Sequence, residues 1–403
     1  MRRSWLIGLF VFITGCGGGG SGSSTGPQAK WTLLVYMNAA NDLYPDSDLN
    51  INQMESLPDR SDVNIIVQWK QSKDVFPGSS FDGVRRYKIR HDSDPSKVTS
   101  PVLASNLADS AGSALDMGSA TTLRDFVDWG KANFPAQRTA LIVWNHGNGW
   151  NKAPEGALSR GVSYDDQYGS HIDTWQLRQA LGSNSLDLVA WDASLMQMAE
   201  VAFELRTIAR FIVGSEESPP AEGYPYDIVL KPFLSSPDAS TPVLARGFVE
   251  GMTGYPLYAN RKITQSVIDA SRLEDVARSL SALGAALSSN RTPMAIVVSR
   301  ARNNAQSYSP SLGRYYRDLA DVCRILEADT ATVDAVRMAA ANVRIAVANA
   351  VVVEGHNSFS PGSHGLAIDF SPGNTFQSYA DDYGKLQLAK DTLWDEFLSF
   401  APN

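Results

Sequence analysis

The chain has 403 residues, of which 43% are hydrophobic and 19% are charged, a balance typical of a folded protein with a large core. Its formal net charge is −8, and no basic run exceeds short pairs such as Arg85-Arg86. The basic surface that nucleic-acid phosphates require is missing, so we expect no nucleic-acid partner. With only two cysteines, Cys16 and Cys323, neither a disulfide framework nor a CxxC metal site is expected.

The N-terminal residues have the pattern of an export signal. A basic pair, Arg2-Arg3, precedes the apolar run Trp5–Ile13, which is too short to span a bilayer in the usual way. The run ends in Ile13-Thr14-Gly15-Cys16, which resembles a bacterial lipobox, whose cysteine is lipidated. The alternative is an ordinary secretory signal with an incidental cysteine. We predict a signal peptide over residues 1–15, followed by lipidated Cys16 and a flexible Gly/Ser tether over residues 16–29. Gly17 after the cysteine favours the outer membrane or cell envelope.

Beyond the tether, short apolar runs alternate with amphipathic helical patterns. Strands are predicted at 31–37, 63–69, 84–90, 138–145, 186–191 and 211–214, and helices at 46–57, 121–134 and 174–181. This alternation predicts an α/β fold with a mostly parallel sheet covered by helices, over residues 30–235.

After about residue 235 the pattern becomes mainly helical. Helices are predicted at 242–252, 271–289, 312–327, 332–350 and 392–400, with short strands at 294–298, 351–353 and 365–370. We therefore predict that residues 236–403 form a C-terminal α/β extension, largely helical, packed on the core.

Two predicted strands end in residues that can carry chemistry. The strand at 138–145 is followed by His146-Gly147, and the strand at 186–191 by Asp192-Ala193-Ser194, after which helical spacing begins directly. In α/β proteins ligands bind outside the carboxyl ends of central strands, where a following helix offers its N-terminal N–H groups to an anion. We therefore expect the Ser194 hydroxyl and the His146 imidazole to share a cleft. The Pro- and Gly-rich acidic loop at 215–226 is expected to form one of its walls.

These two motifs resemble those of the caspase-like peptidases, and most closely those of the clostripain family. The resemblance extends to YMNAANDL, LIVWNHGNGW, the Tyr164-Asp165-Asp166 turn, WDASLMQMAEVAFEL, SEESPPAEGYPY and GLAIDFSP, in that order and spacing. It implies a caspase-like fold and the cleavage of peptides or proteins next to Arg or Lys residues. Independently of this resemblance, the predicted lipid on Cys16 would attach the chain to the membrane.

The resemblance also implies roles for individual residues. His146 matches the catalytic His of the family, and Ser194 occupies the position of its catalytic Cys. The family's oxyanion hole implies that the N–H groups of Ser194 and Gly147 stabilise the oxyanion. The acidic residues of its specificity pocket correspond to Asp192 and Glu222, which suit an Arg or Lys side chain.

Two further family properties depend on residues elsewhere. Many members cut themselves after a basic residue between the His and Cys motifs, which makes Arg160 the better self-processing candidate and Lys152 the second. Some members depend on calcium, so a calcium requirement is possible by resemblance. The residues themselves predict no metal site, and Tyr164-Asp165-Asp166 is interpreted as a turn.

The serine at position 194 leaves the activity open. A thiol with a pKa near 8.5 can be ionised by a neighbouring imidazolium, whereas a serine hydroxyl cannot. Serine hydrolases use a third group to orient the His, and a Cys–His dyad is not obviously built with one. If the missing thiol costs roughly 10⁴–10⁶ in rate, as deletion of a nucleophile does, the chain would be silent as a protease.

Three functions remain open from the sequence. The chain is a peptidase that uses Ser194 and His146, an inactive descendant that binds basic peptides or a protein partner in the same groove, or a scaffold. Individual residues also have simpler interpretations. Ser194 would be the N-cap of the following helix, His146 a buried core residue, and Glu216 and Glu217 solvated loop charges.

Overall fold

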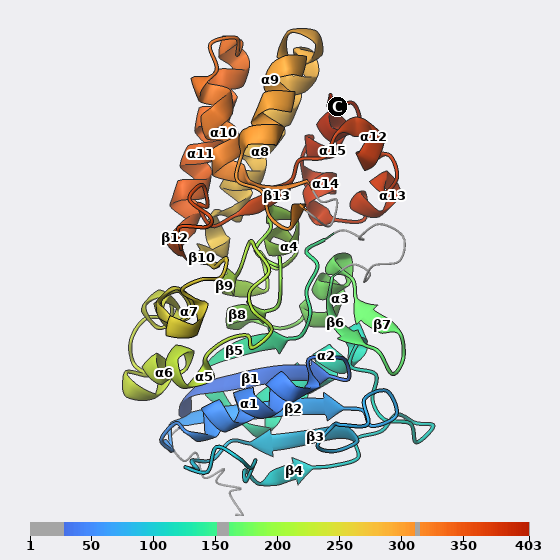
Figure 1. The fold of residues 1–403 in the computed structure, drawn as a ribbon, viewed down its shortest axis with the longest axis vertical. Helices are drawn as coiled ribbons and strands as arrows, with labels where there is room; N and C mark the ends of the chain where they lie inside the picture. The colour runs from blue at the N-terminus through green and yellow to red at the C-terminus, as the bar shows by residue number, and fades with distance from the viewer. Residues whose placement is uncertain (1–27, 151–160, 311–314, 403) are drawn as a thin grey trace, which may run out of the picture.

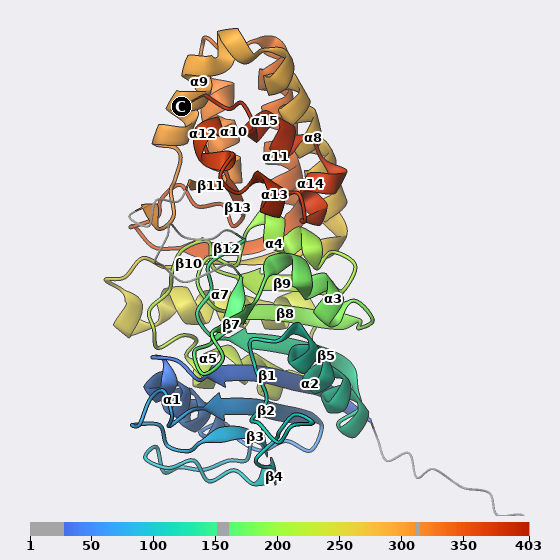
Figure 2. The same ribbon diagram turned by 90° about the vertical axis from the view of Figure 1, so that its right-hand side faces the viewer.

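The computed structural model describes residues 28–150, 161–310 and 315–402. In this part of the chain, nine strands form one sheet in the order β12-β10-β9-β8-β5-β1-β2-β3-β4, stacked along the long axis of the molecule (Figures 1 and 2). The bounds of these strands are Ala29–Ala39 (β1), Val63–Gln71 (β2), Gly83–Lys88 (β3), Val102–Ala104 (β4), Ala136–Trp144 (β5), Leu186–Asp192 (β8), Ala209–Gly214 (β9), Thr264–Asp269 (β10) and Val351–His356 (β12).

The five central strands run parallel, from β9 through β8, β5 and β1 to β2, and antiparallel strands flank them on both sides. The register places Met37 of β1 beside Trp144 of β5, and Trp144 beside Asp192 of β8. Because these strands are parallel, the segments that follow them leave the same edge of the sheet side by side. The predicted α/β class with a mostly parallel sheet is confirmed.

Helices cover both faces of the sheet because successive side chains of each central strand point to opposite faces. Leu33, Val35 and Met37 of β1 pack in the cluster of helices α1 and α5–α7, whereas Leu34 and Tyr36 pack in the cluster of α2, α3 and α4. These helices are Tyr44–Glu55 (α1), Ala120–Asn133 (α2), Leu177–Leu181 (α3), Ala199–Glu204 (α4), Tyr226–Val229 (α5), Lys231–Ser235 (α6) and Thr241–Gly254 (α7).

The C-terminal part carries most of the remaining helices, at the top of Figure 1. Its strands β10 and β12 continue the main sheet, so its connection to the core includes backbone hydrogen bonds as well as packed side chains. The division of the chain at residue 235 remains a prediction. The helices are Leu273–Ser289 (α8), Arg291–Asn304 (α9), Leu319–Ala328 (α10), Asp334–Ala350 (α11), Gly373–Phe376 (α12), Ala380–Tyr383 (α13), Gln387–Asp391 (α14) and Trp394–Leu398 (α15).

Two small antiparallel sheets lie outside the main one. One joins β6 (Val162–Asp165) to β7 (Ser170–Ile172), and the other joins β11 (Tyr316–Asp318) to β13 (Ala367–Asp369). Short 3₁₀ turns occur at Thr174–Gln176, Pro256–Tyr258 and Ala270–Arg272.

The predicted strand at 294–298 is wrong, because these residues lie within α9. Its buried side chains, Met294, Val297, Val298 and Ala301, recur at intervals of three and four, while Ile296 is 72% exposed. A strand would have placed Ile296 on the same face as Met294 and Val298. The short run of β-branched residues therefore gave a misleading signal.

The predictions for the N-terminus concern residues outside the described ranges. The signal peptide, Cys16 and nearly all of the tether precede residue 28. Within the ranges that are described, no helix combines the length and the apolar character needed to cross a membrane.

Candidate active site

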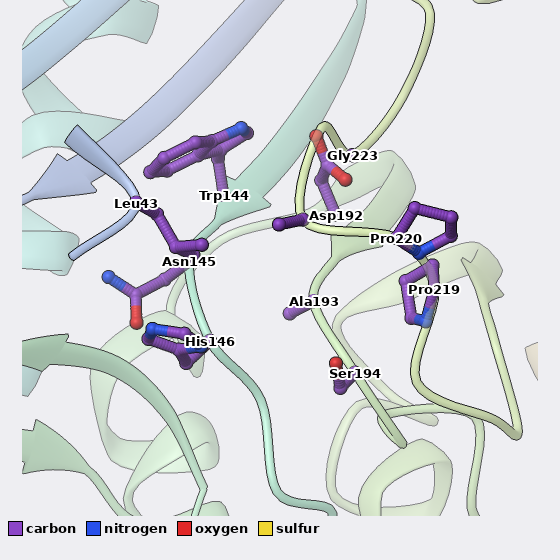
Figure 3. Close-up of a pocket in the computed structure, with 11 residues that line it drawn as sticks. Leu43, Trp144, Asn145, His146, Asp192, Ala193, Ser194, Pro219, Pro220 and Gly223 are labelled. Atoms are coloured by element: carbon purple, nitrogen blue, oxygen red, sulfur yellow. The ribbon is translucent and has the colours of Figure 1, made fainter. Parts of the chain in front are cut away.

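A cavity of about 200 Å³ lies at the carboxyl ends of the central strands. His146 follows β5 on one side of it and Ser194 follows β8 on the other, and both side chains border the same space (Figure 3). The lining residues are Leu43, Trp144, Asn145, His146, Asp192, Ala193, Ser194, Pro219, Pro220, Ala221 and Gly223. The structure thus brings His146 and Ser194 to one cavity, although they are far apart in sequence.

His146 contacts a carboxylate that the sequence interpretation did not include. Its Nε2 atom lies 2.6 Å from Oδ1 of Asp42, in the loop after β1. The side chain of His146 is 26% exposed, so it is not a buried core histidine, and the ring of Tyr164 packs edge-on to it at 6.4 Å. In the sequence, Asp42 follows the first predicted strand, which makes it a candidate site residue. Its contact with His146 could not be predicted without the strand order, which places β1 beside β5.

Two asparagine side chains hold the loops after β1 and β5 together. The Asn145 side chain donates to the backbone oxygens of Asn38 and Tyr164, and its own oxygen accepts the N–H of Tyr164 at 2.7 Å. The Asn41 amide likewise donates to Tyr164 O at 3.0 Å, and its oxygen accepts the N–H of Leu43 at 3.1 Å. These bonds fix the backbone on both sides of the Asp42–His146 contact.

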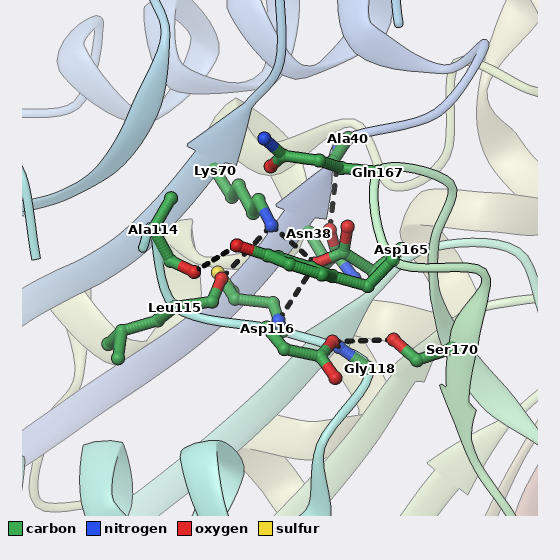
Figure 4. A network of polar contacts seen from close by, with 12 residues as sticks. Asn38, Ala40, Lys70, Ala114, Leu115, Asp116, Gly118, Asp165, Gln167 and Ser170 are labelled. Atoms are coloured by element: carbon green, nitrogen blue, oxygen red, sulfur yellow. Dashed lines mark hydrogen bonds and ion pairs between the residues drawn. The ribbon is translucent and has the colours of Figure 1, made fainter. Parts of the chain in front are cut away.

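The Tyr164-Asp165-Asp166 turn carries a buried ion pair. Lys70 Nζ of β2 lies 2.7 Å from Asp165 Oδ2 and also donates to Leu115 O at 3.0 Å (Figure 4). Both side chains are fully buried, and burial lowers the pKa of Lys70 and raises the pKa of Asp165. The ammonium therefore already supplies the positive charge at this carboxylate.

We assign no calcium site to this turn, because the Asp165 carboxylate is already paired with the Lys70 ammonium. Among the described residues, no group of three or more His, Cys, Asp or Glu side chains is arranged to hold a metal ion. We therefore derive no step through calcium.

Asp192 is the buried acid of the cavity. Its carboxyl group accepts hydrogen bonds from the Tyr224 N–H at 3.0 Å and the Tyr226 hydroxyl at 2.9 Å, and the residue is 5% exposed. Burial raises its pKa to about 7, although these two hydrogen bonds oppose the shift. A carboxylate can accept about four hydrogen bonds, and the described residues supply these two.

Glu222, the second predicted acid, does not line the cavity. Its backbone oxygen accepts a hydrogen bond from the Asn50 amide at 3.0 Å, and its side chain is half-buried. Asp46, in the first turn of α1, is its electrostatic neighbour, because burial and then the charges of Glu222 and Asp42 raise the pKa of Asp46. Glu222, Asp46 and Asp42 are not among the residues that line the cavity, whereas Asp192 is.

Ser194 lies in an irregular segment rather than at a helix start. Helix α4 begins at Ala199, so the predictions that a helix follows Ser194 directly and that Ser194 is its N-cap are wrong. Leu195 has a φ of +64°, and its N–H donates to Glu217 O at 3.3 Å, which turns the backbone away from a helix. Left-handed geometry at a leucine costs of order 1–3 kcal/mol and often marks a functional site.

The backbone of Gly147 lies against that of Ser194. A Cβ atom at Gly147 would lie 2.4 Å from Ser194 O and 2.9 Å from Ser194 N. Among the hydrogen bonds of the described residues, none uses the N–H of Gly147 or Ser194, and none joins the Ser194 hydroxyl to the His146 ring. Within the described residues, both N–H groups are thus left without an acceptor.

Glu216 and Glu217 are buried, so their interpretation as solvated loop charges is wrong. The Glu216 side chain accepts the N–H of Gly365 at 3.1 Å, and burial together with the charge of Asp318 raises the pKa of Glu216 well above its ordinary value. Glu217 accepts the N–H and hydroxyl of Ser309 at 3.2 and 2.8 Å. Both acids fasten the loop that walls the cavity to the C-terminal part.

Comparison with known proteins gives consistent matches. A model of the clostripain family matches residues 35–400. Clostripain from Hathewaya histolytica is 27% identical over 203 residues, which cover 46% of this chain but only 38% of that protein.

Several solved structures match most of the chain, among them the following two. One is an inactive zymogen C11 protease from Parabacteroides distasonis, with 19% identity, a TM-score of 0.65, and coverage of 91% of this chain and 98% of that chain. The other is a secreted C11 cysteine protease from Bacteroides thetaiotaomicron in complex with an irreversible peptide inhibitor, with 19% identity, a TM-score of 0.62, and coverage of 89% and 99%. At this identity the two matches show a shared fold.

Proposed function

Since the chain belongs to the clostripain family, we propose that its cavity binds an Arg or Lys side chain of a peptide or protein and that Ser194 cuts the neighbouring peptide bond. The observation that carries the proposal is that a buried carboxyl group, Asp192, shares one cavity with Ser194 and His146. A guanidinium or ammonium group would supply the positive charge that the buried carboxylate lacks.

The proposed reaction follows from the groups around the cavity. The Ser194 oxygen attacks the carbonyl carbon, its proton passes to His146, and the resulting oxyanion accepts hydrogen bonds from the N–H groups of Ser194 and Gly147. His146 then gives the proton to the leaving amine, and an acyl group remains on Ser194. Water then attacks the acyl carbon while His146 takes its proton. The carboxylic acid product leaves, and His146 returns the proton to the Ser194 oxygen.

The second candidate function is binding of basic peptides without cleavage. It is favoured by the serine at the position of the family's cysteine, and by the lack of a Ser194–His146 hydrogen bond within the described chain. Catalytic hydrogen bonds are often long in substrate-free structures, so this geometry does not by itself decide against catalysis.

Peptides that differ only in one residue separate the two candidates. We expect the purified full chain to cut a peptide after Arg or Lys and to leave the matched Leu peptide intact. Tight binding of the Arg peptide without cleavage would establish the second candidate. If the chain neither binds nor cuts any basic peptide, both are wrong.

Affinity for an Arg peptide should depend on pH through Asp192. Without a ligand, the pKa of Asp192 is raised from 3.8 to about 7. Protonation of Asp192 therefore stabilises the folded state, and this stabilisation is lost as the pH rises from about 4 to about 7. A bound guanidinium requires the carboxylate. Between pH 5 and pH 8 affinity should therefore rise about 100-fold, since each pKa unit is worth a factor of ten.

This pH dependence is best measured by calorimetry on Ser194→Ala, which prevents cleavage. Binding should also release a proton below pH 7, which calorimetry in buffers of different ionisation enthalpy detects. A Leu peptide is the control ligand. Affinity for the Arg peptide that stays constant from pH 5 to pH 8 would contradict the assignment of Asp192.

Gly223 leaves space for the Asp192 carboxyl group. Its φ is +67°, and a Cβ atom there would lie 2.7 and 2.9 Å from the two carboxyl oxygens. We expect Gly223→Ala to displace Asp192 and weaken binding of Arg peptides at least about tenfold, the effect of 1.4 kcal/mol. Gly169→Ala is the matched control, because Gly169 has a φ of +62° with no atom within 4 Å of the added Cβ. Equal affinity in the two variants would show that contact with Asp192 does not matter.

We also propose that the chain is an exported bacterial lipoprotein held at the cell envelope through lipidated Cys16. The lipobox and the tether support this, and Gly17 after the cysteine favours the outer membrane. In a bacterial host, Cys16→Ala should lose a metabolic palmitate label and leave the membrane fraction. Retention of the label in that variant would rule the proposal out.

Self-processing after Arg160, which lies outside the described residues, is tested by sequencing the N-termini of the purified chain.

A further inference from the structure

We propose that Asp42 is a positioning residue that orients His146 and thereby allows a serine to act as the nucleophile. This inference rests on the proposed function and deepens it. Its basis is the 2.6 Å contact between Asp42 Oδ1 and His146 Nε2, at the cavity that also contains Ser194. A dyad with a thiol does not need this contact, because the thiolate forms before the attack.

The contact decides which ring nitrogen carries the proton. A carboxylate is only an acceptor, so Nε2 must be the donor and Nδ1 is left with a free lone pair. During attack Nδ1 takes the proton of the Ser194 hydroxyl as the oxygen bonds to the carbonyl carbon. The imidazolium that forms is then stabilised by the negative charge of Asp42, and Asp42 itself keeps no proton.

The position of Asp42 is set by the fold. Strands β1 and β5 are neighbours in register, so the loops after them emerge together, and the Asn41 and Asn145 side chains tie both loops to Tyr164 O. Asp42 is 71% exposed in the substrate-free molecule, where water weakens its attraction for an imidazolium. A peptide seated over the cavity would exclude water and strengthen the attraction at the moment of proton transfer.

Two other acids affect the same region. Burial and then the charge of Asp42 raise the pKa of Asp166, whereas His146 lowers it, and Asp46 also feels the charge of Asp42. Within the described residues, Asp42 is the acid that has a hydrogen bond to the His146 ring. Asp166→Asn is therefore the matched control, because it removes a charge near His146 but leaves the hydrogen bond in place.

The test measures how fast the Ser194 hydroxyl reacts with a reagent that has no Arg or Lys side chain, so it does not depend on the proposed specificity pocket. A fluorophosphonate is attacked by the Ser194 oxygen, fluoride leaves phosphorus, and the serine proton passes to His146. We expect Asp42→Asn to slow this labelling and kcat for an Arg peptide by about 10²–10⁴-fold, up to the loss known for the equivalent change in a Ser-His-Asp triad. In Asp42→Asn, KM for the Arg peptide should stay close to its original value. Asp42→Glu should keep part of the original rate. Asp166→Asn should react at nearly the original rate.

A second background distinguishes orientation from a general structural defect. In Ser194→Cys, the additional change Asp42→Asn should slow peptide cleavage about tenfold or less. Equal losses in the serine and cysteine backgrounds, or an equal loss in Asp166→Asn, would overturn the inference. So would failure of the original chain to react with the fluorophosphonate. Labelling that depends on Asp42 in a chain that does not cut Arg peptides would instead refute the proposed substrate and leave the role of Asp42 standing.

Discussion

Ser194→Ala is expected to lower the rate of cleavage after Arg by about 10⁴–10⁶-fold, because it removes the atom proposed to attack the peptide bond. The same variant should bind an Arg peptide at least as well as the original chain, since Asp192 and the rest of the cavity are unchanged. The measurements are kcat on a fluorogenic Arg peptide and the dissociation constant of a non-cleavable analogue.

Ser218→Ala is the control for this experiment. Ser218 lies in the loop that walls the cavity, and its hydroxyl contacts the Ser309 hydroxyl at 3.1 Å, but it does not line the cavity. It should cut at nearly the original rate. If Ser194→Ala cuts Arg peptides as fast as the original chain, the nucleophile lies elsewhere and the proposed reaction is wrong.

Asp192→Asn should abolish most of the preference for Arg and Lys. The change preserves the shape of the side chain but leaves a bound guanidinium in the cavity without its counter-charge, which typically costs 2–5 kcal/mol. The ratio of kcat/KM for an Arg peptide to that for a Leu peptide should therefore fall by about 30–5,000-fold. Most of the fall in this ratio should come from a lower kcat/KM for the Arg peptide.

Asp187→Asn provides the comparison on the same strand. Asp187 lies near the opposite end of β8, where its carboxylate pairs with Arg210 at 3.4 Å, far along the strand from the cavity. It should keep the original preference. An unchanged preference in Asp192→Asn would instead assign the specificity to other acids nearby, such as Glu222 and Asp46.

Much of the core was predictable because its strands are strongly apolar. The runs that became β1, β2, β5, β8 and β9 were all expected, and so was the emergence of His146 and Ser194 at strand ends. The resemblance to the clostripain family is confirmed by the match over residues 35–400. In contrast, β10 was missed, since its Thr264, Gln265 and Ser266 are buried polar residues without an apolar pattern.

The rest of the site depended on information that a single sequence does not contain. Asp42 meets His146 only because β1 is the neighbour of β5, and strand order is a property of the whole sheet. The late start of α4 follows from the left-handed Leu195 and from its bond to Glu217 O, a contact between segments on different strands. The burial of Glu216 likewise depends on Gly365, about 150 residues later.

The attachment of the cavity wall to the C-terminal part limits how far the protein can be shortened. Glu216 and Glu217 follow β9, yet their partners Gly365 and Ser309 come from the last third of the chain. A truncated version that stopped at residue 235 would leave two carboxylates without those partners and would expose the edge of β9. Shortened or chimeric versions of this chain should therefore retain the residues on both sides of position 235.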